Sequence, residues 1–93
     1  MAKERSFLQK LSDETDVIWP GVTLIELVED SRILIENHFG VAEYSPVRMR
    51  INTTYGQVII YGRCLDLQRM TKDQLVIRGT VNCIKTVRGN GNE

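Results

Sequence analysis

The only histidine of this 93-residue chain, His38, is the first residue to test for chemistry. It lies in the stretch ILIENHFG (33–40), between an asparagine and an aromatic residue. A general base needs an orienting partner, and a hydrolase also needs a nucleophile beside it. The chain contains no G-x-S-x-G elbow, no Cys-His signature and no H-E-x-x-H motif. Asn37, His38 and Gly40 tolerate turn conformations, so we interpret them as turn residues. We expect no catalytic residue.

The two cysteines, Cys64 and Cys83, are 19 positions apart. With one distant histidine they are too few to indicate a metal site. Both occur in apolar, strand-like runs, where cysteine usually behaves as a small buried hydrophobe. We therefore expect two buried, reduced cysteines and no bound metal or cofactor. A disulfide or a redox role is the alternative.

The carboxylates and glycines do not form a recognisable catalytic or phosphate-binding pattern. Glu26, Glu29, Asp30, Glu36 and Glu43 are scattered over strands and turns. We interpret them as solvated or edge-strand charges that deter unwanted strand pairing. The internal glycines of the second half are predicted to lie in strand bends and turns rather than in a phosphate loop: Gly56, Gly62 and Gly79.

The arginines are the most informative functional candidates. If they gather on one surface they could bind an anion or a protein. Few tyrosines accompany them, and no RNA-binding aromatic motif is present. The residues of this predicted interaction surface are Arg48, Arg50, Arg63, Arg69 and Arg78. A solvated or protein-binding surface is favoured, and nucleic-acid binding is the alternative.

The charge is unevenly distributed although the formal net charge is zero. Residues 1–46 hold four Lys/Arg and nine Asp/Glu, which gives −5, and residues 47–93 hold eight and three, which gives +5. Such asymmetry can indicate an anionic partner, head-to-tail association or attraction between halves of one fold. The sequence does not choose among them.

Composition and length indicate one small globular domain. Hydrophobic residues make up 42% of the chain and charged residues 26%, which is ordinary for a soluble protein. No apolar run approaches the roughly 20 residues that cross a bilayer, and the start lacks the apolar region of a secretory signal. We expect a cytoplasmic protein without membrane insertion.

The chain from residue 22 onward has the periodicity of β-strands. VTLIELV (22–28) and RILIEN (32–37) predict a hairpin, and VAEYS (41–45) predicts a short strand that ends at Pro46. Strict alternation follows over residues 47–53, with Val47, Met49, Ile51 and Thr53 on a core face. The residues expected to face the core are Ile33, Ile35, Met49, Ile51, Val58, Ile60, Leu65, Leu67, Leu75, Ile77 and Val81.

Two later runs resemble each other at an offset of 17: Val58-x-Ile60-x-Gly62 and Leu75-x-Ile77-x-Gly79. A glycine inside a strand pattern indicates a bulge or bend, which lets a small sheet curl over its own core. We predict an all-β fold, a small curled antiparallel meander of about six or seven strands that forms a roll or incomplete barrel. Residues 1–16 would form an N-terminal segment with a short helix, 17–87 the β domain and 88–93 a flexible tail.

One partial similarity concerns the Sm-like RNA-binding barrels. GQVIIYG (56–62) and IRGTV (77–81) are similar to their first and second motifs. In that family a variable stretch separates the motifs, whereas here only seven positions separate Met70 from Ile77. This similarity supports only the alternative function, a small β-barrel-like module that binds nucleic acid through the basic second half.

An ordered set of segments resembles the YabP/YqfC family of sporulation proteins, and the YqfC branch most closely. The resemblance covers roughly residues 17–87, and its most specific parts are the I-E-N-H-x-G element and the paired I-x-G bends. The segments are WPGVTL (19–24), IENHFGV (35–41), YGQVIIYG (55–62), LDLQRM (65–70) and LVIRGTV (75–81).

This resemblance implies a bacterial sporulation protein made in the mother cell, with no established enzymatic activity or cofactor. We expect a structural or adaptor component that binds protein partners, among them a membrane-associated sporulation protein, at the forespore membrane. Exposed sheet edges would also allow a homo-oligomer.

Overall fold

Alternating apolar and polar residues produce six β-strands in the computed structural model, which describes residues 21–89. Within that range no helix is long and apolar enough to cross a membrane. The predicted helix in residues 1–16 and most of the predicted tail lie outside the described residues. The strands are β1 (Leu24–Val28), β2 (Arg32–Glu36), β3 (Val41–Tyr44), β4 (Arg48–Asn52), β5 (Gly56–Met70) and β6 (Gln74–Arg88).

All strand pairs are antiparallel, so the predicted all-β class is confirmed. The order in the sheet is β1-β2-β6-β5-β4-β3, which corrects the expected simple meander. β2 pairs with β6 rather than with β3, because its buried residues Ile33 and Ile35 lie opposite the equally apolar Ile77 and Leu75. The chain must therefore cross from β2 to β3 through residues 37–40.

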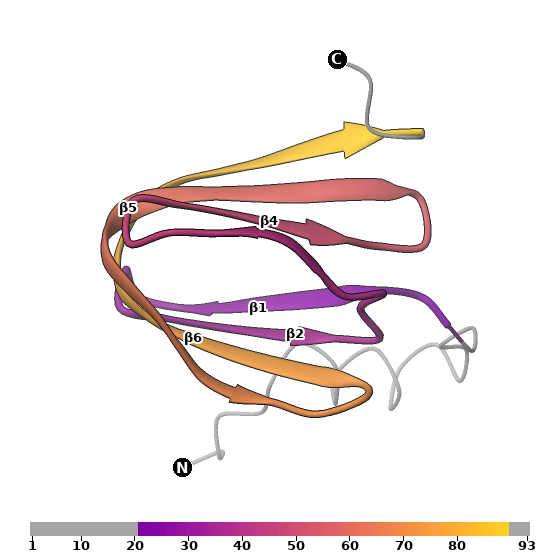
Figure 1. The fold of residues 1–93 in the computed structure, drawn as a ribbon, viewed down its shortest axis with the longest axis horizontal. Coiled ribbons are helices and arrows are strands. Elements are labelled where there is room, and N and C mark those ends of the chain that lie inside the picture. Colours follow the sequence, from indigo (N-terminus) through magenta and orange to yellow (C-terminus); the bar gives the residue numbers. More distant parts are fainter. Residues whose placement is uncertain (1–20, 90–93) are drawn as a thin grey trace, which may run out of the picture.

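The two 15-residue strands β5 and β6 bend in the middle, and this bend folds the open sheet into two layers (Figure 1). The first half of β6 pairs with β2, whereas the first half of β5 pairs with β4. The first layer therefore contains β1, β2, the first half of β6 and the second half of β5. The second layer contains the second half of β6, the first half of β5, β4 and β3. Gly62 and Gly79 lie at the bend. A Cβ on Gly62 would stand 1.9 Å from the carbonyl oxygen of Thr80, and one on Gly79 would stand 2.6 Å from that of Cys64. The close approach of the two strands therefore requires glycine at both positions.

The layers enclose one core. Nine of the residues expected to face inward are buried in it, and Leu67 and Val81 pack against it partly buried. Ile59 and Val87 are buried as well, although the alternation places them on the outer face of β5 and β6. The nine core residues are Ile33, Ile35, Met49, Ile51, Val58, Ile60, Leu65, Leu75 and Ile77.

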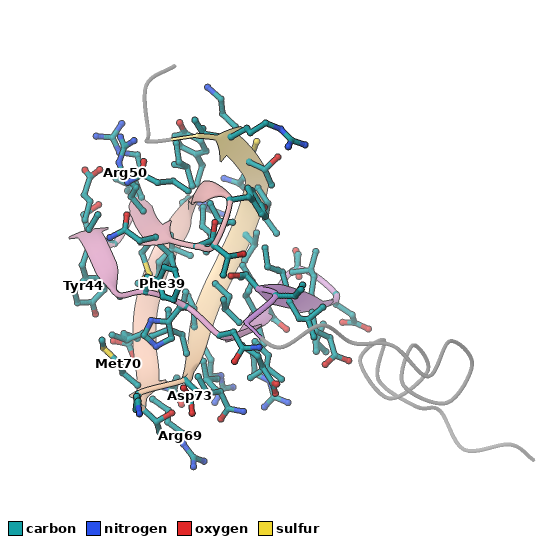
Figure 2. The ribbon with its side chains drawn as sticks, turned by 90° about the vertical axis from the view of Figure 1, so that its right-hand side faces the viewer. Phe39, Tyr44, Arg50, Arg69, Met70 and Asp73 are labelled. Carbon is teal, nitrogen blue, oxygen red and sulfur yellow. The ribbon has the colours of Figure 1, made fainter. Side chains whose placement is uncertain are left out.

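The fold leaves two different sides. One side, called here the β1 side, carries β1 and the second half of β6, which end the two layers (Figure 2, right). The other, the β3 side, carries β3 and the second half of β5. The crossing segment 37–40 runs between the layers at the open end opposite the bend.

Candidate protein-interaction surface

The crossing segment is held by backbone hydrogen bonds to both layers. Asn37 donates to the carbonyl of Asp73 (2.6 Å), in the turn between β5 and β6. Phe39 donates to the carbonyl of Asn52 (2.8 Å), whose own N–H donates to the carbonyl of Gly40 (2.9 Å). Asn37 and Gly40 adopt positive φ angles of 65° and 108°, so the segment makes two sharp turns within four residues. The first layer is thereby tied to the second at their open end.

His38 is the centre of this tie. Its side chain is buried, with 6% exposed. The Gly40 N–H donates to Nδ1 (2.8 Å), and Nε2 lies 3.0 Å from the carbonyl oxygen of Thr71. Because Nδ1 accepts, the proton is assigned to Nε2, which donates to Thr71. Both ring nitrogens are thus engaged by the backbone, and the imidazole acts as a cross-layer link.

Burying His38 turns the next residue, Phe39, outward. Phe39 is 66% exposed, and two further large apolar side chains on the same face are about half exposed: Tyr44 (53%) and Met70 (52%). Figure 2 shows Phe39, from the crossing segment, at the open end that faces the viewer, and Tyr44 from β3 and Met70 from β5 to its left, toward the β3 side. We call these three residues the Phe39 patch.

Hydrogen bonds hold the parts of the Phe39 patch in place. The Tyr44 hydroxyl donates to Oδ1 of Asp66 and accepts from the N–H of Leu67, each at 3.3 Å, so β3 reaches across to β5. Thr71, which binds His38, directly follows Met70. The three apolar side chains therefore project from the crossing segment and from two strands, β3 and β5, that are bonded to one another.

Two of the predicted arginines lie together next to this face. Arg48 donates to Oε2 of Glu43 through Nε (3.1 Å) and Nη2 (2.8 Å), and Arg50 Nε lies 3.4 Å from Oε1. The hydrogen bond from Arg48 lowers the pKa of the Glu43 carboxyl, and the same bond raises the pKa of Arg48. Arg50 also donates to the side-chain oxygen of Gln57 (3.2 Å). Arg48 and Arg50 thus share the Glu43 carboxylate, and its negative charge reduces the net positive charge of the two arginines.

The other three predicted arginines are elsewhere. Arg63 is exposed at the bend, opposite Thr80, and Arg78 lies between Arg32 and Asp66 on the neighbouring strands. Arg69 lies near the end of β5, and Figure 2 shows it at the far end of the face from Arg50. The structure therefore brings together Arg48 and Arg50 but does not gather all five arginines on one surface.

Gly56 and the two cysteines are the remaining residues that were singled out from the sequence. Gly56 begins β5 opposite Arg88, next to a shallow hollow lined by residues 52–57 and Gly89.

The cysteines were expected to be buried, and that is wrong, since both are exposed and unpaired by disulfide. Cys64 lies in the irregular stretch of β5 with a φ of 55°, and Cys83 lies opposite Tyr61. No group of His, Cys, Asp and Glu that could hold a metal occurs among residues 21–89.

The exposed apolar residues Phe39, Val47 and Met70 were not predicted from the sequence. Val47 was expected on the core face but is 59% exposed, because the tight turn bonded from Ser45 to Arg48 (2.9 Å) lifts it off the sheet. Phe39 and Met70 follow or end strands, where alternation no longer predicts the direction of a side chain. A large aromatic residue inside a turn motif was the one available signal.

Comparison with known proteins adds one match. A model of the YabP family matches residues 21–93, which include the whole sheet, the crossing segment and the Phe39 patch. No curated protein and no solved structure matches the chain.

Proposed function

Because this chain belongs to the YabP family, as the match over residues 21–93 shows, we propose that it is a non-enzymatic structural or adaptor component of sporulation. Family membership is consistent with a sporulation-associated protein. The finer parts are our inference: a place nearest the YqfC branch, action in the cytoplasm of the mother cell, and a location at the forespore membrane through contact with a membrane-associated protein.

The Phe39 patch is the observation that carries the adaptor role. Exposed aromatic and methionine side chains that cluster on one face are typical of protein-binding surfaces, and a few such anchors supply most of the binding energy. The patch is held in place, because each of its residues makes or adjoins a hydrogen bond to another segment: Phe39 to Asn52, Tyr44 to Leu67, and Thr71, which follows Met70, to His38. A patch that is held in place loses little conformational entropy when a partner covers it.

The environment of His38 supports a non-enzymatic role. A catalytic imidazole must present one nitrogen to a reacting group. Here Nδ1 accepts from Gly40 and Nε2 bonds to Thr71, and only 6% of the side chain is exposed. Its role in this structure is to position Phe39 and to hold the layers together.

Co-purification from sporulating cells of the source bacterium tests the proposal. The tagged full-length protein serves as bait, beside the variants Phe39→Ser and Met70→Ser and the control Tyr55→Ser. Tyr55 is also an exposed aromatic residue (37%) but lies in the turn between β4 and β5, outside the patch. We expect one sporulation protein to be retained by the wild type and the control and lost from both patch variants. Equal retention by Phe39→Ser would refute the role of the patch.

Nucleic-acid binding is the second candidate, because Arg48 and Arg50 are neighbours on one strand face. Glu43 lies between them and offsets part of their charge, so a protein partner is favoured. Phosphate-driven binding weakens steeply as salt rises. Retention of RNA or DNA at low salt that disappears at about 0.5 M salt and in Arg48→Ser would transfer the function to this candidate.

A further inference from the structure

Two regular sheet edges lie on the β1 side. β1 pairs with β2 in an uninterrupted register from Leu24↔Glu36 to Val28↔Arg32. The second half of β6 pairs with β5 in an equally regular register from Gly56↔Arg88 to Tyr61↔Cys83. Within residues 21–89 no strand lies against the outer side of either one. We call these the β1 edge and the β6 edge.

Alternation shows which backbone groups these edges present. Asn37 donates to Asp73 and Gly79 to Ser31, so the odd-numbered residues of β2 bond to β6 and the even-numbered ones to β1. The N–H and C=O groups of Ile25 and Leu27 therefore point away from β2, toward the β1 edge.

The second half of β6 presents its backbone groups by the same alternation. Gly89 donates to the carbonyl of Tyr55, so the odd-numbered residues of this half bond to β5. Ile84 and Thr86 consequently direct their backbone groups toward the β6 edge. On each edge two residues, spaced two positions apart, thus present N–H and C=O groups that can bond to a further strand.

The edges on the β3 side are protected in ways that the β1 side lacks. β3 has only four residues, contains a register shift between Val41 and Glu43, and carries the ion pair to Arg48. The second half of β5 has register shifts on both sides of the pair formed by Asp66 and Leu67 with β6. Short length, bulges and charges are the features by which proteins prevent edge pairing.

The β1 and β6 edges also carry opposite charge. Residues 24–36, which form the β1–β2 hairpin, contain four acidic residues and one arginine, so their net charge is −3: Glu26, Glu29, Asp30, Glu36 and Arg32. Residues 82–89 contain Lys85 and Arg88 and no acidic residue, so their net charge is +2. A β1 edge that paired with itself about Glu26 would place two carboxylates opposite each other, which is destabilising.

We propose that two copies of this chain form a dimer in which the β1 edge of each copy pairs antiparallel with the β6 edge of the other. Glu26 lies opposite Lys85 of the second copy. In this register the residues of β1 whose backbone groups point outward lie opposite the residues of β6 whose backbone groups point outward. Inner-face side chains of β1 then lie beside inner-face side chains of β6, and outer-face side chains beside outer-face ones. The remaining pairs are Leu24 with Val87, Ile25 with Thr86, Leu27 with Ile84 and Val28 with Cys83.

A two-fold axis along the strands would make both junctions at once. The β1 edge ends one layer and the β6 edge ends the other, on the same side of the molecule (Figure 2). β1 and the second half of β6 also run in opposite directions, as their arrowheads show in Figure 1. Rotation by 180° about the strand direction exchanges the layers and keeps the strand directions, so each edge meets the other type in antiparallel orientation. The interface is then closed and self-complementary.

Leu27 supports this position of the interface. It is 47% exposed although it lies on the inner face of β1, in line with the buried Ile33 of β2. In the dimer the side chain of Ile84 of the second copy would lie beside Leu27 on the same inner face and cover part of its exposed surface. The inference goes beyond the proposed function and does not depend on it, because the Phe39 patch lies on the other side and stays open.

Charge exchange tests the pairing. Sedimentation equilibrium or light scattering over a concentration series would be applied to the full chain, to Glu26→Lys and to Lys85→Glu, each alone and mixed in equal amounts. We expect a dimer for the wild type and dissociation constants at least about tenfold higher for each variant alone, since both junctions then hold like charges. The equimolar mixture should regain the wild-type affinity, because both of its junctions hold opposite charges.

The matched control is Glu36→Lys, which reverses the same charge on β2, one strand away from the free edge; it should raise the dissociation constant much less than Glu26→Lys does. A monomeric wild type at about 0.1 mM, a dimer unaffected by both single variants, or a mixture that fails to recover would each overturn the proposal. Assemblies larger than a dimer would overturn the two-fold closure. Circular dichroism of every variant shows that loss of the dimer is not loss of the fold.

Discussion

The β1 side and the β3 side of this sheet end in opposite ways. On the β3 side the strands are short or irregular, and side chains do the linking: His38 binds the backbone of Thr71, and Tyr44 binds Asp66 and Leu67. On the β1 side the strands are regular, and their outer backbone groups face no strand among residues 21–89. The β3 side is therefore linked mainly by side chains across short or irregular strands, whereas the β1 side presents the backbone groups of two regular strands outward.

This difference separates two kinds of recognition. A side whose edge strands are short or irregular offers little regular backbone for pairing, so a partner there must be bound through side chains, and the β3 side offers Phe39, Tyr44 and Met70 for that purpose. An edge with open backbone groups recognises any strand of the right direction, so charge must supply the specificity. The acidic β1 hairpin and the basic end of β6 fit this requirement.

The largest effect is expected at the bend that creates both sides. In Gly62→Ala the added Cβ would lie 1.9 Å from the carbonyl oxygen of Thr80, a backbone atom that cannot move without separating β5 and β6. We expect a loss of about 3 kcal/mol or more in the free energy of unfolding, measured by urea denaturation. A loss below about 1 kcal/mol would show that the strands do not approach so closely in solution.

Proline substitutions compare used and unused backbone groups on β1. The N–H of Glu26 bonds to β2, whereas the N–H of Leu27 points to the open edge. Glu26→Pro should therefore cost about 3 kcal/mol in stability, and Leu27→Pro about 1 kcal/mol, with loss of any pairing at that edge. Equal destabilisation by the two variants would mean that the hydrogen-bond alternation of β1 is assigned incorrectly.

On the β3 side, removal of the imidazole tests the cross-layer link. His38→Ala leaves the Gly40 N–H and the Thr71 carbonyl without their partner and opens a cavity beside the core. We expect a loss of about 2 kcal/mol in chemical denaturation. Hydrogen exchange at Gly40 should accelerate more than at Val87, whose N–H bonds to β5, because only the β3 side loses a bond. Uniform acceleration at both positions would contradict the separation of the two sides.

The smallest effect is expected at the exposed ion pair of β3. The hydrogen bond from Arg48 lowers the pKa of Glu43, so the carboxylate stabilises the folded state above its ordinary pKa of 4.5. That contribution is lost as the pH falls through the lowered pKa of the folded state. Thermal unfolding of wild type and Glu43→Gln should thus differ slightly at pH 7 and converge once the pH is below the lowered pKa of Glu43 in the folded state. High salt should reduce the difference at pH 7, and a difference that grows toward acid pH would contradict this sign.

Much of the fold followed from local pattern. The period-two alternation in residues 47–53 and the two runs Val58-x-Ile60-x-Gly62 and Leu75-x-Ile77-x-Gly79 identified strands and most of the core, and the hairpin between β1 and β2 was predicted within two residues of its bounds. Asn37 and Gly40 were predicted as turn residues from their type alone, and both adopt positive φ. These features depend on neighbours within a few positions, which a single sequence displays.

The pairing of β2 with β6 was not predictable in this way. Ile33 and Ile77 are 44 positions apart, and several apolar strands could have accepted β2 equally well by pattern. The exposure of the cysteines has a similar cause, because the register shift between Arg63 and Asp66 reverses the alternation around Cys64, and the shift between Tyr61 and Gly62 does so beside Cys83. A bulge changes which face a residue occupies without changing its composition.

By itself the amino-acid sequence determined that this protein is built from β-strands, where the chain turns, and that its glycines mark the bend. Only the tertiary structure decided which strands are neighbours and that His38 joins two layers. It also decided that both open edges lie on one side of the molecule and Phe39 on the other. The physical reason is range: periodicity and turn preference act over a few residues, whereas burial and edge exposure depend on contacts between segments distant in the chain.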